Sequence, residues 1–120
     1  MKYFLALFSD EAMWAKFTPA EQAAGLASYR AYVDALKQAG HFVSTDRLGP
    51  TSTATTIRTN GNGKQQVLDG PYVDTKEQFG GYFIIDVPDL DAAIAWAARC
   101  PAASHGAVEL RPLWEMDGPA

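Results

Sequence analysis

The sequence has a single cysteine and no long apolar run. With only Cys100, no disulfide can form within the chain, which fits a reducing compartment. Its apolar surroundings, "AIAWAARCP", favour a buried structural thiol over a nucleophile. The N-terminal segment "MKYFLALFSDEAMW" alternates and is apolar over only about seven residues, which is too short for a secretory signal or a membrane span. We therefore expect a cytoplasmic protein.

Basic clusters and metal-binding patterns are also missing. The formal net charge is -4 and no run of Lys or Arg occurs, which argues against nucleic acid or an anionic membrane as a partner. His41 and His105 lie far apart, and neither H-x-x-x-H nor C-x-x-C occurs, so we expect no metal site. The glycines of "NGNG" precede no predicted helix, which excludes a phosphate-binding loop there. A small organic ligand or another protein is the expected partner, without a cofactor.

The residues that are present are typical of one folded domain. Of the 120 residues, 48% are hydrophobic and 20% are charged, which places the chain among globular proteins. This length supports one core and is too short for two. Residues 1–120 are therefore expected to form a single domain.

The segment "TPAE" predicts the start of the first helix. Thr18 is suited to be the N-cap, Pro19 to open the first turn and Glu21 to complete a capping box. Gly40 is suited to end this helix. Its apolar residues recur at three- and four-residue spacing and are expected to face the core: Leu26, Tyr29, Val33 and Leu36.

The remaining pattern predicts a second helix and six strands. The helix is expected from Asp89 to the stop at Pro101, and Ser9 to Phe17 is expected to be a loop. Strands are expected at residues 2–8, 41–48, 54–59, 64–69, 81–87 and 107–113, with "NGNG" as the turn of a hairpin. This order predicts a ferredoxin-like α+β sandwich: a mostly antiparallel sheet, two helices on one face and an inserted β-hairpin.

One face of such a sheet is left uncovered by the helices. Alternation along the last strands places large and charged residues there, and the hairpin is expected to add two more, which gives Arg58, Asp69, Tyr82, Ile84, Asp86, Glu109 and Arg111. A face of this kind is too apolar for plain surface and too polar for core. Pairing of two such faces across a two-fold axis accounts for it, so we expect a homodimer.

Carboxylates at the ends of strands are the candidates for chemistry. Asp10 follows the first strand and Asp69 ends the fourth, so either could serve as a base for proton transfer. Tyr72, Lys76 and Arg111 are the candidates that bind or polarise a substrate. Asp69 precedes Gly-Pro, where anchoring of a turn is an equally good interpretation.

Other polar residues have ready structural interpretations. Asp74 with Thr75 is suited to cap a short helical turn through Glu77. His41 follows Gly40 and is expected to hydrogen-bond the end of the helix, with substrate binding as the second interpretation. Trp14 is expected to fold over the mouth of a pocket.

The stretch "LDGPYVDTKEQFGGYFIIDVPDLDAAIAWAARCPAASHGAVELRPL", together with "MKYFLALFSDEAMW" and "LGPTSTATTIRT", resembles the DGPF subfamily of YCII-related proteins. The usual "DGPF" is here "DGPY", Asp69 to Tyr72. The resemblance covers nearly the whole chain and implies a dimeric α+β barrel built from two ferredoxin-like sheets. Relatives of this subfamily are often encoded beside, or fused to, extracytoplasmic-function sigma factors, which implies a regulatory role.

The resemblance also implies a site of one Asp and one His, and a related member is a dehydrochlorinase of a chlorinated hydroxyquinol. Asp10 matches the position of the aspartate. The histidine is expected on the first helix, where this chain reads "ASYRAYVDAL". Either Tyr29 or Tyr32 replaces it, or His41 reaches in from elsewhere, or the chemistry differs or is absent.

Two functions follow from these observations. The first is a cofactor-free lyase or isomerase that acts on a small, aromatic organic substrate with Asp10 or Asp69 as the base. The second is a non-catalytic module that binds a ligand or a sigma factor through the same face.

Overall fold

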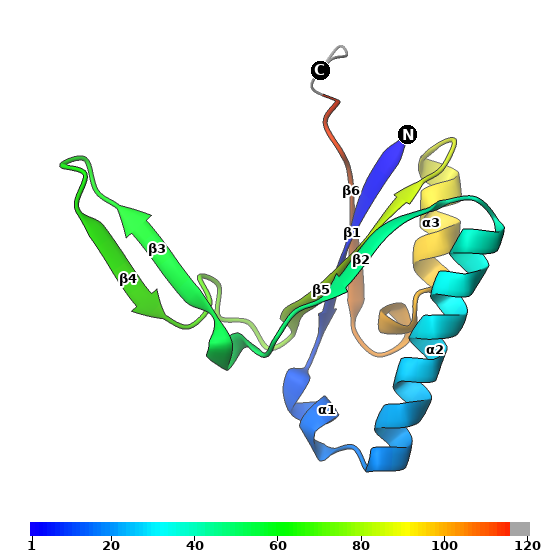
Figure 1. Cartoon of the computed structure of the whole chain (residues 1–120), viewed down its shortest axis with the longest axis horizontal. Helices are drawn as coiled ribbons and strands as arrows, with labels where there is room; N and C mark the ends of the chain where they lie inside the picture. The colour runs from blue at the N-terminus through cyan, green and yellow to red at the C-terminus, as the bar shows by residue number, and fades with distance from the viewer. Residues whose placement is uncertain (116–120) are drawn as a thin grey trace.

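The structure is a computed structural model that describes residues 1–115 (Figure 1). The strands are β1 (Lys2–Ser9), β2 (Phe42–Arg47), β3 (Thr55–Thr59), β4 (Gln65–Asp69), β5 (Gln78–Asp86) and β6 (Ala107–Pro112). The helices are α1 (Glu11–Lys16), α2 (Pro19–Gln38) and α3 (Leu90–Arg99), with short 3-10 turns η1 (Thr51–Thr53) and η2 (Pro101–Ser104). Among the described residues, no helix is long and apolar enough to cross a membrane.

Four strands form one sheet in the order β2-β5-β1-β6, and every neighbouring pair is antiparallel. Helices α2 and α3 lie on one face of this sheet (Figure 1). This is the ferredoxin-like α+β arrangement that the order of elements predicts, so the predicted fold class is confirmed. We call the sheet face opposite α2 and α3 the open face.

The core lies between the four-stranded sheet and the two long helices. Leu5, Leu36, Ile85 and Cys100 are its largest fully buried side chains, so the prediction of a buried thiol is confirmed. Leu26 was expected in the core but is 38% exposed. The core positions on α2 begin one turn later, because the N-terminal half of this long helix extends past the sheet (Figure 1).

The capping signals of the helices are confirmed. Thr18 Oγ1 accepts from the Glu21 amide at 3.1 Å, and the Glu21 carboxylate accepts from the Thr18 amide at 2.9 Å. Asp89 Oδ1 accepts from the Ala92 amide at the start of α3. Gly40 has φ 77, the left-handed conformation that a glycine adopts at low cost after a helix.

The predicted loop at residues 9–17 is wrong, because it contains α1. Asp10 caps this helix by accepting from the Ala12 amide at 3.0 Å. Trp14 rests against α2, where a Cβ on Gly25 would lie 3.1 Å from the indole ring. Six residues are too few for a periodic apolar stripe, so the helix depends on its cap and on this contact.

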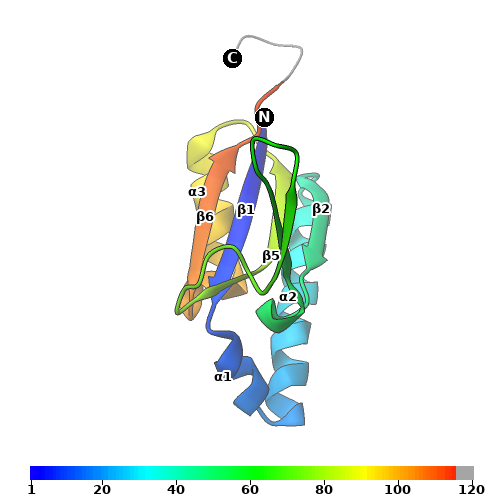
Figure 2. The ribbon, with the colours of Figure 1, turned by 90° about the vertical axis from the view of Figure 1, so that its left-hand side faces the viewer.

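Strands β3 and β4 form a separate two-stranded sheet, which we call the arm. Figure 1 shows it standing well away from the main sheet on the side opposite the helices, and Figure 2 shows it in front of the open face. The hairpin at "NGNG" is confirmed. The expectation that Arg58 and Asp69 lie on the uncovered face of the main sheet is wrong, because both belong to the arm.

Candidate functional site

Strand register shows which side chains line the open face. Tyr82 of β5 and Glu109 of β6 both lie opposite Ala6 of β1, and Ile84 and Arg111 both lie opposite Phe4. Residues paired in this way share a face, while Phe83, Ile85, Val108 and Leu110 pack with the core on the other face. The alternation read from the sequence therefore places the charged and aromatic residues of β5 and β6 correctly.

Four aromatic rings form a continuous row on the open face. The Phe8 and Phe79 ring centroids lie 5.6 Å apart, those of Phe79 and Phe4 lie 6.4 Å apart, and Phe4 stacks on Tyr82 at 5.3 Å. These distances are typical of favourable aromatic pairs. Neither long helix covers the sheet face on which this row lies (Figure 2), so the row offers an apolar floor.

Phe79 reaches the open face because of an irregularity in β5. Gly81 lies opposite Leu7, but the next pair toward the start of β5 is Phe79 with Phe8, so Gly80 is an extra residue. Strict alternation from Phe83 would place Phe79 on the helix side. The extra residue reverses its direction, as β-bulges do.

Polar groups flank the aromatic row on both sides. On the β2 side, the Tyr82 hydroxyl donates to Asp46 Oδ2 at 2.6 Å. This hydrogen bond stabilises the neutral phenol and raises the pKa of Tyr82. On the β6 side, Arg111 Nε donates to Glu109 Oε1 at 3.0 Å. The floor thus lies between two carboxylates, one of which is paired with a guanidinium.

Asp10 and Trp14, two residues predicted for the site, lie beyond the end of β1, past the edge of this face. Asp10 acts as the α1 cap, and Trp14 lies under the guanidinium of Arg47, whose Cζ is 4.6 Å from the ring centroid. Arg111 pairs with Phe4, six residues before Asp10 along β1, so it lies about 20 Å from Asp10 at the rise of a β-strand.

Glu11 ties this end of the sheet to its neighbours. Its carboxylate accepts from the amide and the hydroxyl of Thr51, and its own amide donates to Gln78 Oε1 at 3.0 Å. Gln78 Nε2 in turn donates to the Thr75 carbonyl at 2.8 Å. These contacts join α1, η1 and the start of β5, so this network has a structural role.

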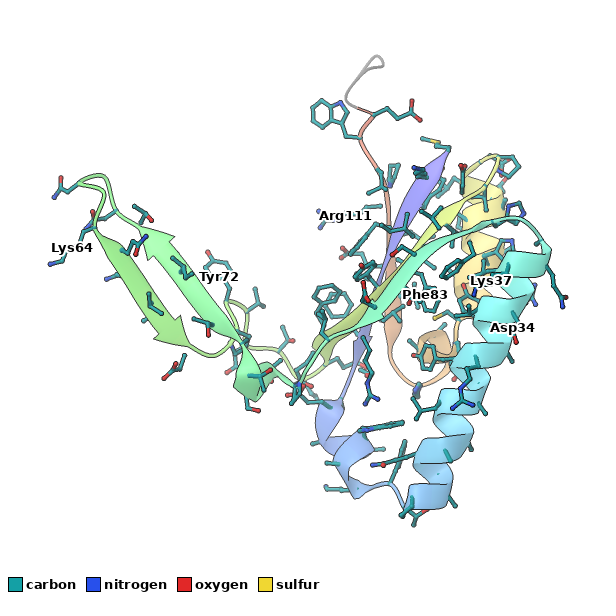
Figure 3. All side chains as sticks on the ribbon, viewed as in Figure 1. Asp34, Lys37, Lys64, Tyr72, Phe83 and Arg111 are labelled. Atoms are coloured by element: carbon teal, nitrogen blue, oxygen red, sulfur yellow. The ribbon has the colours of Figure 1, made fainter. Side chains whose placement is uncertain are left out.

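Asp69 and Tyr72 lie on or beside the arm. Asp69 pairs with Thr55, and the Gly70 amide donates to the Ala54 carbonyl at 2.8 Å, so a backbone bond closes this turn and anchoring by the Asp69 carboxylate stays a prediction. Tyr72 lies beside β3 (Figure 3), where the Arg58 guanidinium is 5.8 Å from its ring centroid. Figure 3 also shows that Tyr72 and Arg111 are well separated within one chain.

Lys76 is an exposed residue of the segment between β4 and β5. The short helical turn expected around Asp74 and Glu77 is absent from this described segment, which consists of bends. There the Thr75 hydroxyl donates to the Glu77 carbonyl instead.

His41 lies at the opposite end of the sheet from Asp10. Its Nδ1 is 2.8 Å from the Asp86 carbonyl, and its ring packs edge-on against Trp96. Asp86 pairs with Lys2 at the start of β1, whereas Asp10 follows the end of that strand. His41 therefore joins the end of α2 to β5 and does not approach Asp10.

Tyr29 and Tyr32 lie on the helix side of the sheet and not beside Asp10. Tyr32 donates its hydroxyl to the Trp96 carbonyl at 2.8 Å, and burial raises its pKa. Tyr29 stacks on Phe83, and burial raises its pKa to about 12. Both are neutral phenols committed to packing, so neither stands in for a histidine base next to Asp10.

The sequence did not reveal Asp46 and Phe79 as members of the open face. Asp46 shares the face of Tyr82 because β2 pairs with β5, and pairing partners are not visible in one strand alone. The signal for Phe79 is the double glycine that follows it, since a glycine inside a strand often marks a bulge. No group of three or more His, Cys, Asp or Glu within residues 1–115 is arranged to hold a metal ion.

Comparison with known proteins identifies the family of this chain. The sequence pattern of the YCII-related domain family matches residues 1–117. An uncharacterized protein of Rhizobium meliloti (strain 1021) is 33% identical over 115 residues, which is 94% of this chain and 92% of the relative. Neither match carries a described activity.

Proposed function

Because the chain belongs to the YCII-related family, we propose that it is a cofactor-free enzyme of the lyase or isomerase type from the DGPF branch of that family. Its substrate is a small organic molecule with an aromatic ring, and its place of action is the cytoplasm. The reaction begins with transfer of a proton from the substrate to a carboxylate. One observation carries this proposal: an aromatic floor lies between two carboxylates on the open face.

The floor supports binding of a planar molecule. An aromatic ring placed on Phe4 and Phe79 gains apolar burial and edge or offset stacking. The guanidinium of Arg111 is suited to hold a carboxylate or a phenolate of the substrate, because its donors form a planar fork. A substrate with a ring and one anionic group matches both features.

Asp46 is the carboxylate best placed to act as the base. Its Oδ2 accepts from Tyr82, which fixes the carboxylate beside the floor and leaves Oδ1 to take a proton. Once protonated, Asp46 returns the same proton to the substrate in an isomerisation, while Glu109 on the opposite flank stays paired with Arg111. Asp10 and Asp69 are second candidates for the base, although Asp10 already caps α1 and Asp69 lies at the base of the arm.

Water is excluded when a second copy covers the open face. A homodimer with two open faces packed together encloses the aromatic rows and both polar flanks in one cavity. Desolvation in such a cavity strengthens the interaction of each carboxylate with a developing charge. The aromatic row supports this pairing, because Phe79 is 39% exposed and the other three rings are only half-buried in a single chain.

The proposal is tested by exchange of carbon-bound hydrogen with solvent deuterium. Phenylpyruvate is a suitable first probe, because it combines a ring, a carboxylate and an acidic benzylic C–H. Proton NMR in D2O measures the loss of that signal with and without protein, and phenylacetone and 4-hydroxybenzyl ketones extend the series. The wild type is expected to accelerate exchange, and Asp46→Asn is expected to slow it about 100-fold or more.

Asp34→Asn is the matched control, because Asp34 lies on the outer side of α2 (Figure 3). It removes the same charge and is expected to retain the wild-type rate. If exchange survives Asp46→Asn but is lost in Asp10→Ala or Asp69→Ala, the base is one of the residues predicted from the sequence. Unaccelerated exchange across the whole series counts against the enzyme.

A non-catalytic module is the second candidate function. The observation in its favour is that Ile57, Val67 and Leu68 are exposed on the arm, as is typical of a protein-binding surface. An extracytoplasmic-function sigma factor is the partner that the DGPF resemblance suggests. Calorimetry with a sigma factor encoded next to this protein separates the two candidates. If the two proteins form no complex at micromolar concentration, the module is excluded.

A further inference from the structure

The arm makes the molecule much less compact than its length requires. The Cα radius of gyration is 16.7 Å and the extents are 50 × 48 × 18 Å. A compact domain of this length has a radius of gyration of about 14 Å. Figure 1 shows that the excess comes from the arm, which leaves the body beside η1. A segment that projects in this way gains little from the core of its own chain.

The exposed area of the single chain supports the same view. It is 8400 Å², whereas a compact monomer of this mass exposes about 6,300 Å². The surplus is about 2,000 Å², and a standard stable interface covers about 800 Å² on each partner. The chain therefore carries more than enough uncovered surface for a permanent partner.

One face of the arm carries an exposed apolar pair. Ile57 and Val67 pair across the hairpin on this face, and each is 63% exposed. The opposite face carries Arg58, which is covered in part by Tyr72. An isolated two-stranded hairpin is at best marginally stable in water, so the Ile57–Val67 face needs a cover.

Charge and direction favour a second copy of this chain as the cover. The arm, from Thr55 to Asp69, carries Arg58 and Lys64 and a single acidic residue, Asp69 at its base, so its outer part is basic. Both edges of the open face carry a carboxylate, Asp46 on β2 and Glu109 on β6. The basic outer part of the arm is complementary to Asp46 of a second copy, whereas Glu109 is already paired with Arg111.

The arm also has the right direction and length. It projects from the open-face side, so it points toward a second copy that packs on that face (Figure 2). Sheets packed face to face lie about 10 Å apart, and a five-residue strand such as β3 spans about 17 Å. The tip, which carries Lys64 (Figure 3), therefore passes the plane of the partner sheet.

We infer that the two copies exchange arms: each arm packs its Ile57–Val67 face against the edge of the other copy's four-stranded sheet and closes one side of the shared cavity. This inference rests on the pairing of open faces proposed above. It adds that part of each binding site is supplied by the partner copy, so a single chain does not form the complete site.

The test uses the full-length protein and intermolecular spin-label broadening. A nitroxide is attached to Asn62→Cys in the turn of the arm, on chains without ¹⁵N. These chains are mixed with ¹⁵N-labelled wild-type chains after brief dissociation. Cys100 is buried and does not compete for the label. Amide signals of β2 or β6 in the ¹⁵N chains are expected to lose intensity. The matched control is a label at Asp34→Cys on the outer side of α2, which is expected to leave these signals intact.

A second measurement uses Ile57→Asp/Val67→Asp, with Gln66→Asp on the other face of the arm as its control. Sedimentation is expected to show about 100-fold or more weaker dimerisation for the double variant and a near-normal dimer for the control. If the wild type is dimeric but the label at residue 62 causes no broadening, arm exchange is overturned and the pairing of open faces still stands. If the wild type is monomeric, both arm exchange and the pairing of open faces are overturned, and the partner of the arm is a different protein. Deuterium exchange of phenylpyruvate reports separately on the enzyme.

Discussion

The hydroxyl of Tyr82 lies 2.6 Å from Asp46 Oδ2 on the open face, so a strand in the centre of the sheet is joined there to the edge strand. The hydrogen bond stabilises the protonated phenol and raises the pKa of Tyr82. Asp46→Asn removes the carboxylate charge and is expected to lower the pKa of Tyr82 toward the ordinary tyrosine value of about 10. Tyrosine labelled at ¹³Cζ reports the titration, and an unchanged Tyr82 pKa in Asp46→Asn would show that this contact does not exist in solution.

The two adjacent glycines of β5 are predicted to respond differently to alanine. A Cβ on Gly81 would lie 3.0 Å from the Asp46 carbonyl and 3.6 Å from Arg47 Cα, so it forces β2 away from β5. A Cβ on Gly80 meets no atom within 4 Å. Urea unfolding should show a loss of about 1–3 kcal/mol for Gly81→Ala and a change within about 0.5 kcal/mol for Gly80→Ala. Equal losses contradict the register given for β2 and β5.

Two leucines of α2 give a matched test of the core. Leu36 is fully buried and Leu26 is 38% exposed. Leu36→Ala is expected to lower the free energy of unfolding by about 2–5 kcal/mol, because it leaves a cavity in the core. Leu26→Ala is expected to cost less than about 1 kcal/mol. Similar losses measured by urea titration would place both leucines in the core and restore the pattern expected from the sequence.

Cys100 is predicted to be unreactive in the folded protein. Burial raises the pKa of its thiol to about 11. The folded state holds the neutral thiol, so burial of Cys100 contributes fully to stability below the pKa of the unfolded thiol, which is about 8.5. This contribution is lost as the pH rises through the pKa of the folded state. Ellman's reagent at pH 8 should therefore react only after unfolding in urea. Rapid reaction of the native protein would place the thiol at the surface.

Much of the fold could be predicted because local signals agree with the final structure. The capping box at Thr18, the left-handed Gly40 and the alternation in β5 and β6 each depend on neighbouring residues only. The short helix α1 was missed because its main support is tertiary: Trp14 packs on Gly25 of α2. Such a contact leaves no periodic pattern within six residues.

The site was harder to predict because it depends on pairings between distant strands. Asp46 joins the open face through the partnership of β2 with β5, and Phe79 joins it through the extra residue at Gly80. Asp69 and Tyr72 were expected to belong to one site with Arg111, yet they lie with the arm. The hairpin sequence shows where the chain turns but not which surface it packs on, since "TTIRT" and "KQQVLD" are polar enough for an exposed position.

The most direct test of the open face as the functional surface is the mass of the protein in solution. Light scattering at micromolar concentration is predicted to give twice the 13.0 kDa of one chain for the wild type. Phe79→Asp places a charge in the centre of the aromatic row and is predicted to give a folded protein of 13.0 kDa. A wild-type mass of 13.0 kDa, or a Phe79→Asp variant that stays fully dimeric, would contradict the account.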